Sequence, residues 1–431
     1  MMNDPFSNLT VLARNFGALR NTPPDASILR AMLSLSATVT PRAPERLVAG
    51  IDSSDNLLLS IPDYPGAAVA GYSYTLVISS QDGNLLYEQK RMADLYPDDT
   101  FEDLEIAVVY NIPLPEFQRR QYVSDYQVRP FIHIPSTRSP YNQVDQMPEY
   151  KLRLAAARYR ETTERRAVRT SLFQSKANFG LLLKDGRLSS QNVSPRFTED
   201  IGRRSVERGI RYVGVVKKGT SLWAALYPYH SELFKQHQKS YWAWIPPEII
   251  MRVYGGSQAE VKTLRLGGRE NLCLGGVGGA WIIYGNRPDT FFILEFNVYD
   301  MSRYRPLTQT GSSYVGMPLE AFNQQTLGWS ATYNTNKNDQ GEYYGTQTQV
   351  SQQDFDTLII PTVQEIDHLA HVSQRSFGYP LPLADAHNRC KINRERKDRF
   401  NERLKVQLQE YGFMPREFET WIDDPHKLME N

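Results

Sequence analysis

Residues 179–219, FGLLLKDGRLSSQNVSPRFTEDIGRRSVERGIRYVGVVKKG, decide the fold class of this chain. The apolar run FGLLLK predicts a buried strand, which ends at Asp185 and a turn glycine. Residues 194–209 are typical of a helix, and residues 210–219 contain a second apolar run of strand length. Helices that alternate with buried strands are the pattern of a mixed α/β core.

The sequence before this stretch predicts further strands and a long helix. Residues 46–54 (RLVAGIDSS), 71–80 and 104–114 combine continuous and alternating apolar runs, which are typical of neighbouring strands. Residues 150–172 repeat apolar side chains at helical spacing. We therefore expect an α/β fold in which a mixed sheet is flanked by helices.

The outer parts of the chain give weaker patterns. Residues 9–20 and 26–39 predict two short helices, and the Pro- and Tyr-rich residues 125–149 predict an irregular connector. Residues 221–299 carry aromatic runs such as WAWIPPEII and TFFILEFNVYD, which predict an additional β-rich region. Helices are expected again towards the C-terminus, in residues 361–376, 383–392 and 394–412.

These patterns divide the chain into four predicted parts. They are a helical N-terminal segment, a core, a polar insertion and a C-terminal helical segment: residues 1–45, 46–300 together with 352–392, 301–351 and 393–431. The insertion is rich in Gly, Asn, Gln and Tyr. Such a composition is typical of an exposed segment that contacts a ligand or partner.

The overall composition indicates a globular protein without a membrane segment. Hydrophobic residues make up 41% of the 431 residues and charged residues 23%. No apolar run reaches the roughly 18 residues that span a bilayer. The N-terminus MMNDPFSNLT lacks the regions of a secretory signal. Cys273 and Cys390 lack the spacing of a zinc site. Because neither a secretory signal nor a membrane segment is recognised, we expect a cytoplasmic protein.

Several common motifs are absent from the sequence. No G-x-x-x-x-G-K-[ST] occurs, so ATP hydrolysis by a P-loop is not expected, and no G-x-S-x-G occurs. His368 and His371 lie three residues apart on a predicted helix, but no cysteine or acid completes a recognised zinc pattern. We interpret them as ordinary helix residues.

Basic residues are concentrated in three runs, although the net charge is only +1. The runs are residues 158–169, 203–218 and 391–405. Each run could neutralise phosphates of a nucleic acid, but a single run of this kind is more commonly a solvated helix or strand face. The sequence leaves these alternatives open.

Three acidic positions carry the chemical prediction. Asp52 and Asp185 follow apolar strand runs, and Glu164 or Glu161 lies on the apolar face of the predicted helix between them. A buried carboxylate is costly unless it is paired or binds a cation. Carboxylates that converge form the oxygen-rich site that Mg²⁺ or Mn²⁺ prefers. Each aspartate could instead cap a turn, because Asp-Ser and Asp-Gly are common turn pairs.

The order of these motifs resembles the NurA family. The similar segments are LVAGIDSS, the helix with Arg160 and Glu164, LLLKDGRL, GIRYVGVVKKG and GYPLPLADAH, which span about residues 47–391. NurA proteins are nucleases with an RNase H-like core. The resemblance implies a metal-dependent DNA nuclease that prefers manganese, forms a homodimer and works with the hexameric translocase HerA on DNA ends.

The resemblance also implies roles for individual residues. Asp52, Asp185 and Glu164 are similar to metal-binding acids, with Glu161 as the alternative to Glu164. His387 would be a late metal ligand or a proton-transfer group. Tyr379 would orient substrate or water, and Lys217 would contact the scissile phosphate.

One departure from the family bears on these assignments. The family commonly has Asp-Gly-Ser after the first strand, whereas this chain has Asp52, Ser53 and Ser54. Asp55 adds a further carboxylate nearby.

Two hypotheses follow from the motifs and the resemblance. The leading hypothesis is DNA hydrolysis in repair or phage defence. The alternative is a catalytically inactive adaptor or DNA-binding subunit of a translocase complex.

Overall fold

The structure is a computed structural model. In it the chain forms two compact units. The described residues are 23–59, 66–79, 87–90, 104–111, 121–124, 128–130, 148–173, 179–188, 195–217, 221–246, 249, 278–297, 300, 305–310, 330–337, 342–349, 352–372 and 378–412. Unit 1 comprises residues 1–43, 186–206 and 211–380, and unit 2 comprises residues 44–185, 207–210 and 381–431.

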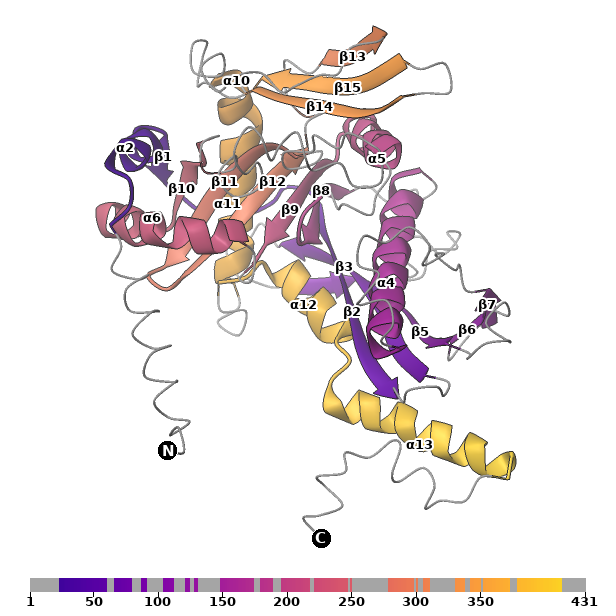
Figure 1. Ribbon diagram of the computed structural model, residues 1–431. Helices are drawn as coiled ribbons and strands as arrows, with labels where there is room; N and C mark the ends of the chain where they lie inside the picture. Colours follow the sequence, from indigo (N-terminus) through magenta and orange to yellow (C-terminus); the bar gives the residue numbers. More distant parts are fainter. Residues whose placement is uncertain are drawn as a thin grey trace, which may run out of the picture. The chain divides into compact units, whose positions relative to one another are not determined.

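Unit 2 is built around a mixed sheet. Three strands, β2 (Leu47–Leu59), β3 (Gly66–Ser79) and β5 (Leu104–Asn111), are antiparallel neighbours, and β8 (Phe179–Asp185) is parallel to β2. The outer strands are β4 (Tyr87–Lys90), which pairs with β3, and β6 (Gln121–Ser124) and β7 (Val128–Pro130), which extend the sheet beyond β5. The long crossover helix α4 (Pro148–Phe173) connects the antiparallel strands to β8 (Figure 1).

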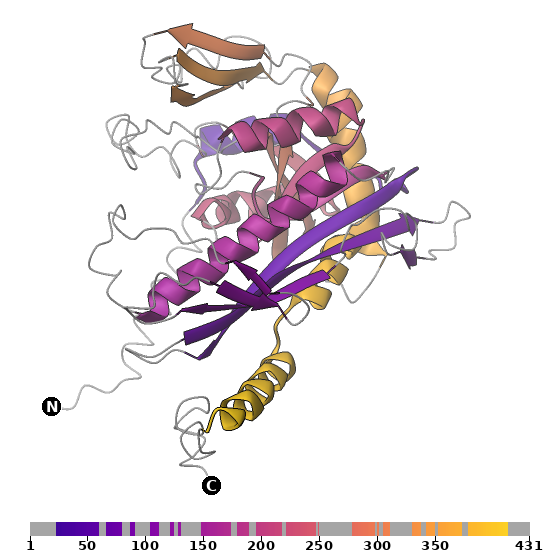
Figure 2. The same ribbon diagram turned by 90° about the vertical axis from the view of Figure 1, so that its right-hand side faces the viewer.

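Two helices of unit 2 lie against β2 and β3. They are α4 and the short helix α12 (Leu381–Cys390), and α13 (Arg394–Glu410) follows α12 (Figure 2). The strand β8 is fully buried over residues 179–183, as its continuous apolar run requires. The helix α13 begins at the N-cap Asn393, whose side chain accepts a hydrogen bond from the Arg396 N–H.

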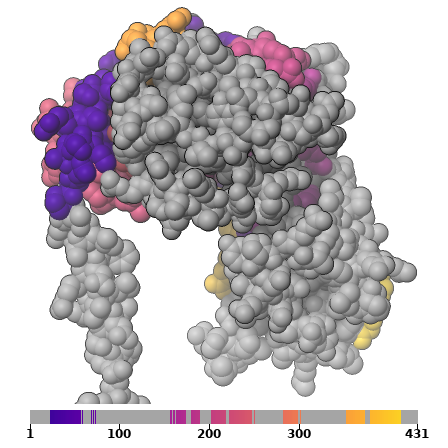
Figure 3. Space-filling view, turned by 45° about the horizontal axis from the view of Figure 1, so that its top comes forward, coloured from indigo at the N-terminus to yellow at the C-terminus, as the bar shows by residue number. Residues whose placement is uncertain are grey.

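Unit 1 contains an antiparallel sheet with the order β1-β10-β11-β12-β9. Its strands are β1 (Ser36–Thr38), β9 (Arg211–Val216), β10 (Tyr241–Trp244), β11 (Gly278–Arg287) and β12 (Thr290–Asn297). Its helices are α2 (Ala26–Ser34), α5 (Pro195–Glu207), α6 (Ser221–His237), α10 (Gln352–Asp354), the π-helix η7 (Phe355–Ile359) and α11 (Ile360–His371). Residues of α2 lie at the molecular surface, in indigo in Figure 3.

A separate three-stranded antiparallel sheet falls within the predicted insertion. Its order is β13 (Arg305–Thr310), β15 (Glu342–Gln349) and β14 (Ser330–Lys337). These strands were not predicted, because their sequences are mostly polar and lack the apolar alternation of a strand with one buried face.

The predicted fold class is confirmed. The chain has a mixed sheet flanked by helices, an additional β-rich region and C-terminal helices. No helix in the described ranges is long and apolar enough to cross a membrane. The predicted helix at residues 9–20 lies outside the described residues.

Three local predictions were wrong. The helix expected over residues 26–39 ends at Ser34, because β1 pairs with β10 and tertiary pairing overrides a weak helix pattern. The strand-like region begins with the helix α6, in which Leu222, Leu226 and Leu233 share a fully buried face that the aromatic residues obscured in the sequence. The predicted connector at residues 125–149 contains the short strand β7.

Candidate metal centre

The strand β2 presents successive side chains to two different helices. Asp52 and Ser54 face α12: Asp52 Oδ2 lies 2.7 Å from His387 Nδ1, and the Ser54 hydroxyl donates a hydrogen bond to the Cys390 carbonyl. Because strand side chains alternate, the intervening residues point to the opposite side of the sheet. This side of β2 is called the α12 face below.

The close approach of α12 depends on a glycine in β2. A Cβ atom on Gly50 would lie 2.5 Å from the backbone carbon and oxygen of Pro382, in the first turn of α12. Backbone atoms cannot move aside as a flexible side chain can, so only glycine fits here. Gly50 thereby allows α12 to bring His387 to Asp52.

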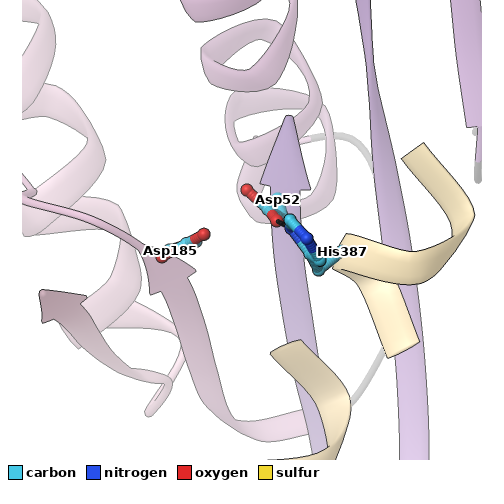
Figure 4. A group of neighbouring side chains, drawn as sticks. All are labelled: Asp52, Asp185 and His387. Atoms are coloured by element: carbon cyan, nitrogen blue, oxygen red, sulfur yellow. Dashed lines mark hydrogen bonds and ion pairs between the residues drawn. The ribbon is translucent and has the colours of Figure 1, made fainter. Parts of the chain in front are cut away.

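Three side chains converge on the α12 face. The ligand atoms of Asp52, Asp185 and His387 all lie within 4.8 Å of one another. Figure 4 shows how they come together from the middle of β2, the end of β8 and α12. The strand register explains why the two aspartates lie close together. Ile51 of β2 pairs with Lys184 of the parallel strand β8, and the aspartates are the next residue on each strand.

The chemistry of this donor set fits a divalent cation. Asp52 is only 5% exposed, and Asp185 is half-buried. Two carboxylates this close repel each other, and burial increases the cost. A cation with a preference for oxygen ligands would relieve both effects, and an added imidazole nitrogen favours Mn²⁺ over Mg²⁺. Among the described residues, this is the one group of three histidine, cysteine or acidic side chains with such spacing.

His387 combines a fixed ring with access to solvent. Its Nδ1 lies 2.7 Å from Asp52 Oδ2, and its side chain is 40% exposed. The Ser53 backbone N–H donates a 2.7 Å hydrogen bond to the other carboxylate oxygen of Asp52. With the Nδ1 proton on the carboxylate side, Nε2 has a lone pair for a metal ion or for a proton.

Cys390 lies beside the cluster but is not suited to ligation. Burial, and then the neighbouring charge of Asp52, raise the pKa of its thiol well above the usual range. The thiol is therefore protonated, whereas a metal-binding cysteine is a thiolate. Its Sγ donates a 3.6 Å hydrogen bond to the His387 carbonyl, one turn earlier in α12.

The two candidate glutamates of α4 are placed differently. Glu164 is 4% exposed and accepts a hydrogen bond from the Ser53 hydroxyl on the side of β2 that faces α4, called the α4 face below. Glu161 forms an ion pair with Arg165 one turn along the helix. Glu164 thus contacts β2, and the choice between Glu164 and Glu161 as a metal ligand stays a prediction.

Two residues on the α4 face were not recognised from the sequence. Lys184 Nζ lies 2.8 Å from Glu164 Oε1 as an ion pair and donates a 2.9 Å hydrogen bond to the Asp185 carbonyl. Ser53 had been noted only as a departure from the family pattern. Alternation along β2 and β8 was the available signal, since it places Ser53 and Lys184 on the face opposite the aspartates.

Lys217 and Tyr379 form a pair of their own in unit 1. The Lys217 ammonium group lies 4.5 Å from the centre of the Tyr379 ring, which is the geometry of a cation–π contact. Tyr379 is 8% exposed and also packs against Phe292. Their predicted roles towards substrate stay predictions.

The histidines of α11 have a structural partner. His371 Nδ1 lies 3.2 Å from Oδ1 of the buried Asp367, and this contact raises the pKa of His371. The Tyr284 hydroxyl donates a 2.5 Å hydrogen bond to the same oxygen. His368 and His371 belong to no three-residue metal group among the described residues.

Comparison with known proteins yields only distant structural similarities. No family model matches the chain, and no curated protein does. The chain is similar to the crystal structure of the NurA nuclease from Sulfolobus solfataricus, with 9% sequence identity and a TM-score of 0.41 over 96% of this chain and 100% of that chain. It is also similar to a NurA structure bound to dAMP and manganese, with 12% identity and a TM-score of 0.30 over 97% of this chain and 99% of that chain.

A third similarity is to endonuclease V from Streptomyces avermitilis. Here the identity is 9% and the TM-score 0.20, over 86% of this chain and 93% of that chain. NurA is the family that the motif order resembles, but TM-scores this low carry no weight for the chemistry of the site. The geometry of Asp52, Asp185 and His387 has to support the function by itself.

Proposed function

We propose that this protein is a metal-dependent deoxyribonuclease whose centre is formed by Asp52, Asp185 and His387. The observation that carries the proposal is the convergence of these three side chains, from separate elements, with ligand atoms within 4.8 Å. A buried and a half-buried acid beside a solvent-accessible imidazole are expensive to maintain for stability alone. It is suited to binding a cation next to a substrate that arrives from solvent.

The residues supply complementary parts of a phosphodiester hydrolysis. Asp52 and Asp185 would hold Mn²⁺ or Mg²⁺ through their carboxylate oxygens. Bound there, the cation supplies Lewis-acid stabilisation of the negative charge that develops on the phosphodiester oxygens. In the reaction a water oxygen would form a bond to phosphorus, and the bond from phosphorus to the leaving sugar oxygen would break. The proton of the attacking water would pass to His387 or to bulk water, and the leaving oxygen would take up a proton from water.

His387 has two possible roles in this scheme. Asp52 holds its Nδ1, so Nε2 either ligates the cation or accepts the proton of the attacking water. In both roles the Asp52 carboxylate fixes the tautomer and the orientation of the ring. A metal-affinity measurement on a His387 variant separates them, as described in the Discussion.

The wider biological setting of the proposal rests on the motif order. We propose a cytoplasmic homodimer that acts on single strands and DNA ends together with a HerA-type hexameric ATPase, in end processing or phage defence. The chain has no P-loop of its own, so translocation would come from the partner. Under this proposal Mn²⁺ supports cleavage better than Mg²⁺.

The test is cleavage of end-labelled single- and double-stranded DNA by the purified protein with Mn²⁺, Mg²⁺ or EDTA. We expect cleavage with Mn²⁺, none with EDTA, and none from Asp185→Asn, which keeps the size of the side chain but removes its charge. Circular dichroism checks that the variant is folded. Cleavage that persists in EDTA or in the folded Asp185→Asn variant would contradict the proposal.

If the wild-type protein alone does not cleave DNA, one further assay is needed, in which the translocase is added. Activity that appears only with the translocase supports a nuclease regulated by its partner. If a folded protein that binds DNA still does not cleave it with the translocase present, the result contradicts the proposed nuclease activity and supports the adaptor hypothesis.

A further inference from the structure

The α4 face of the sheet contains a buried ionic network directly behind the candidate metal centre. Its members are Ser53 of β2, Lys184 of β8 and Glu164 of α4. The side chains of Glu164 and Lys184 are only 5% and 13% exposed. A buried ion pair gains little stability over apolar residues of the same size, so its presence at this position calls for a specific explanation.

The network contacts the chain next to both candidate ligands. Ser53 directly follows Asp52, and its hydroxyl donates a hydrogen bond to Glu164 Oε2. Lys184 directly precedes Asp185, and its ammonium group lies 2.8 Å from Glu164 Oε1. The Glu164 carboxylate therefore contacts both β2 and β8. In each strand the contact is made by the residue next to the aspartate, whose side chain lies on the opposite face.

Lys184 also fixes the backbone of the second ligand. Its ammonium group donates a 2.9 Å hydrogen bond to the Asp185 carbonyl, at the last residue of β8. A strand end is held by fewer ladder hydrogen bonds than a strand centre, so its conformation depends on contacts of this kind. Through Lys184, Glu164 is connected to the backbone of Asp185.

We infer that Glu164 is a positioning residue, which acts through Ser53 and Lys184 to set the separation of Asp52 and Asp185 for the cation. The inference rests on the proposed metal centre and deepens it. Glu164 thus resembles the outer residues that orient metal ligands, whose loss typically weakens metal binding about 10- to 100-fold. Its charge is matched by Lys184 and is not directed at the cation.

The alternative role of Glu164, as a direct ligand, predicts an effect of opposite sign. If Glu164 ligated the cation, Lys184 would compete with the cation for the same carboxylate. Removing the lysine charge would then tighten Mn²⁺ binding. If Glu164 is a positioning residue, removing Lys184 loosens the aspartates and weakens Mn²⁺ binding.

The experiment is a Mn²⁺ titration, followed by electron paramagnetic resonance, of the full-length wild type and of Lys184→Met. Methionine keeps the length and apolar part of the side chain without the charge. We expect a Kd that rises about 10- to 100-fold, with an unchanged number of bound ions and with cleavage recovering at saturating Mn²⁺. A loss of folding alone would not produce this recovery.

Two further variants keep the test decisive. Ser53→Ala removes only a hydroxyl and leaves the Lys184–Glu164 ion pair intact. It replaces Lys184→Met as the test variant if Lys184→Met does not fold. We expect Ser53→Ala to weaken Mn²⁺ binding less than Lys184→Met does. Arg160→Met is the matched control, because it breaks the 3.1 Å ion pair to Asp55 farther along the same face of β2. We expect the Kd for Mn²⁺ to be unchanged in this control.

Two results in a wild type that binds Mn²⁺ and cleaves DNA would overturn the inference while leaving the proposed function intact. One is a tighter Kd in Lys184→Met, which would show that the lysine charge opposes the cation and does not position its ligands. The other is a Kd unchanged in Ser53→Ala and in any folded Lys184→Met. A wild type that neither binds Mn²⁺ nor cleaves DNA would instead overturn the proposed function together with the inference.

Discussion

The two faces of strand β2 handle their acidic residues in different ways. On the α4 face, two acids have a cationic partner: Glu164 pairs with Lys184, and Asp55 pairs with Arg160. On the α12 face, Asp52 shares its space with a second aspartate and a histidine. The same strand thus carries charges that are neutralised within the protein on one side and charges gathered for a cation on the other.

This difference indicates which carboxylates are available for chemistry. A carboxylate that is held by a lysine or arginine has its charge compensated and its position fixed. A pair of carboxylates that face each other gains from binding a cation, and a neighbouring histidine at the surface can move protons. The structure brings four acids, from distant segments of the sequence, to β2 and its neighbours, and side-chain alternation along the strands separates them into two groups.

The largest expected effect contrasts two aspartates of the same strand. Asp52→Asn on the α12 face should reduce DNA cleavage by about 1000-fold or more, because a bound metal contributes several kcal/mol to the transition state. Asp55→Asn on the α4 face should leave cleavage nearly unchanged. Initial rates with saturating Mn²⁺ measure both, and equal losses in the two folded variants would remove the distinction between the faces.

A smaller effect is expected from the histidine of the α12 face. His387→Ala should reduce cleavage by about 100-fold, the lower range for the loss of a proton-transfer group. The matched control is His371→Ala, which removes a histidine that also contacts an aspartate but lies in unit 1. Full activity of His387→Ala would exclude His387 from the site.

The same His387 variant separates the two roles of its imidazole. If His387 is a ligand, the Kd for Mn²⁺ rises in His387→Ala. If it transfers a proton, the Kd stays constant and the rate at saturating Mn²⁺ falls. Parallel titrations of Mn²⁺ binding and of cleavage distinguish these outcomes.

The packing of α12 on β2 gives a prediction about stability. Gly50→Ala places a methyl group 2.5 Å from the Pro382 backbone, so overpacking should lower the free energy of unfolding by about 1–3 kcal/mol. Gly180→Ala, on the neighbouring strand β8, meets Arg46 Cβ at 3.0 Å and should cost less, because the added methyl group approaches its neighbour less closely. Urea unfolding of both variants checks the order, and a greater loss in Gly180→Ala would contradict it.

The smallest effect concerns a histidine that is enclosed in unit 1, in contrast to the exposed His387. Burial lowers the pKa of His230 from 6.5 to about 4, so the folded protein resists protonating it. Its contribution to stability is complete above pH 6.5 and is lost as the pH falls from 6.5 to about 4.

The corresponding variant is His230→Gln, which does not titrate but can still bond to the Tyr241 hydroxyl. About one pH unit below 6.5, the wild type should have lost about 1 kcal/mol more of its unfolding free energy than this variant. Unfolding curves at several pH values measure the difference. Parallel pH profiles for the two proteins would show that His230 is not the group responsible.

The central part of the fold was predictable from the sequence because its strands and helices have strong apolar periodicity. The strands β2, β8 and β9 and the helices α4 and α12 were expected near their observed positions. The helix α6 was missed because its aromatic residues suggest strands, and β1 was missed because its pairing with β10 is invisible locally. Such pairings depend on residues far away in the sequence.

The candidate site was predictable in its residue types but not in its grouping. Asp52 and Asp185 stood out because each follows an apolar strand, whereas His387 lies 335 residues after Asp52 and was recognised only through the family resemblance. The network of Ser53, Lys184 and Glu164 was not foreseen. It depends on the parallel register of β2 and β8 and on the rotation of α4, which the sequence does not fix.

The most direct test of the central claim is a Mn²⁺ binding measurement on the wild type and on the double variant Asp52→Asn/Asp185→Asn. Electron paramagnetic resonance reports free Mn²⁺, and circular dichroism checks the fold. If Asp52, Asp185 and His387 form a metal centre, the wild type binds Mn²⁺ saturably and the folded double variant loses that site. Equal affinity and stoichiometry in the two proteins would show that the cation, if it binds, does so elsewhere.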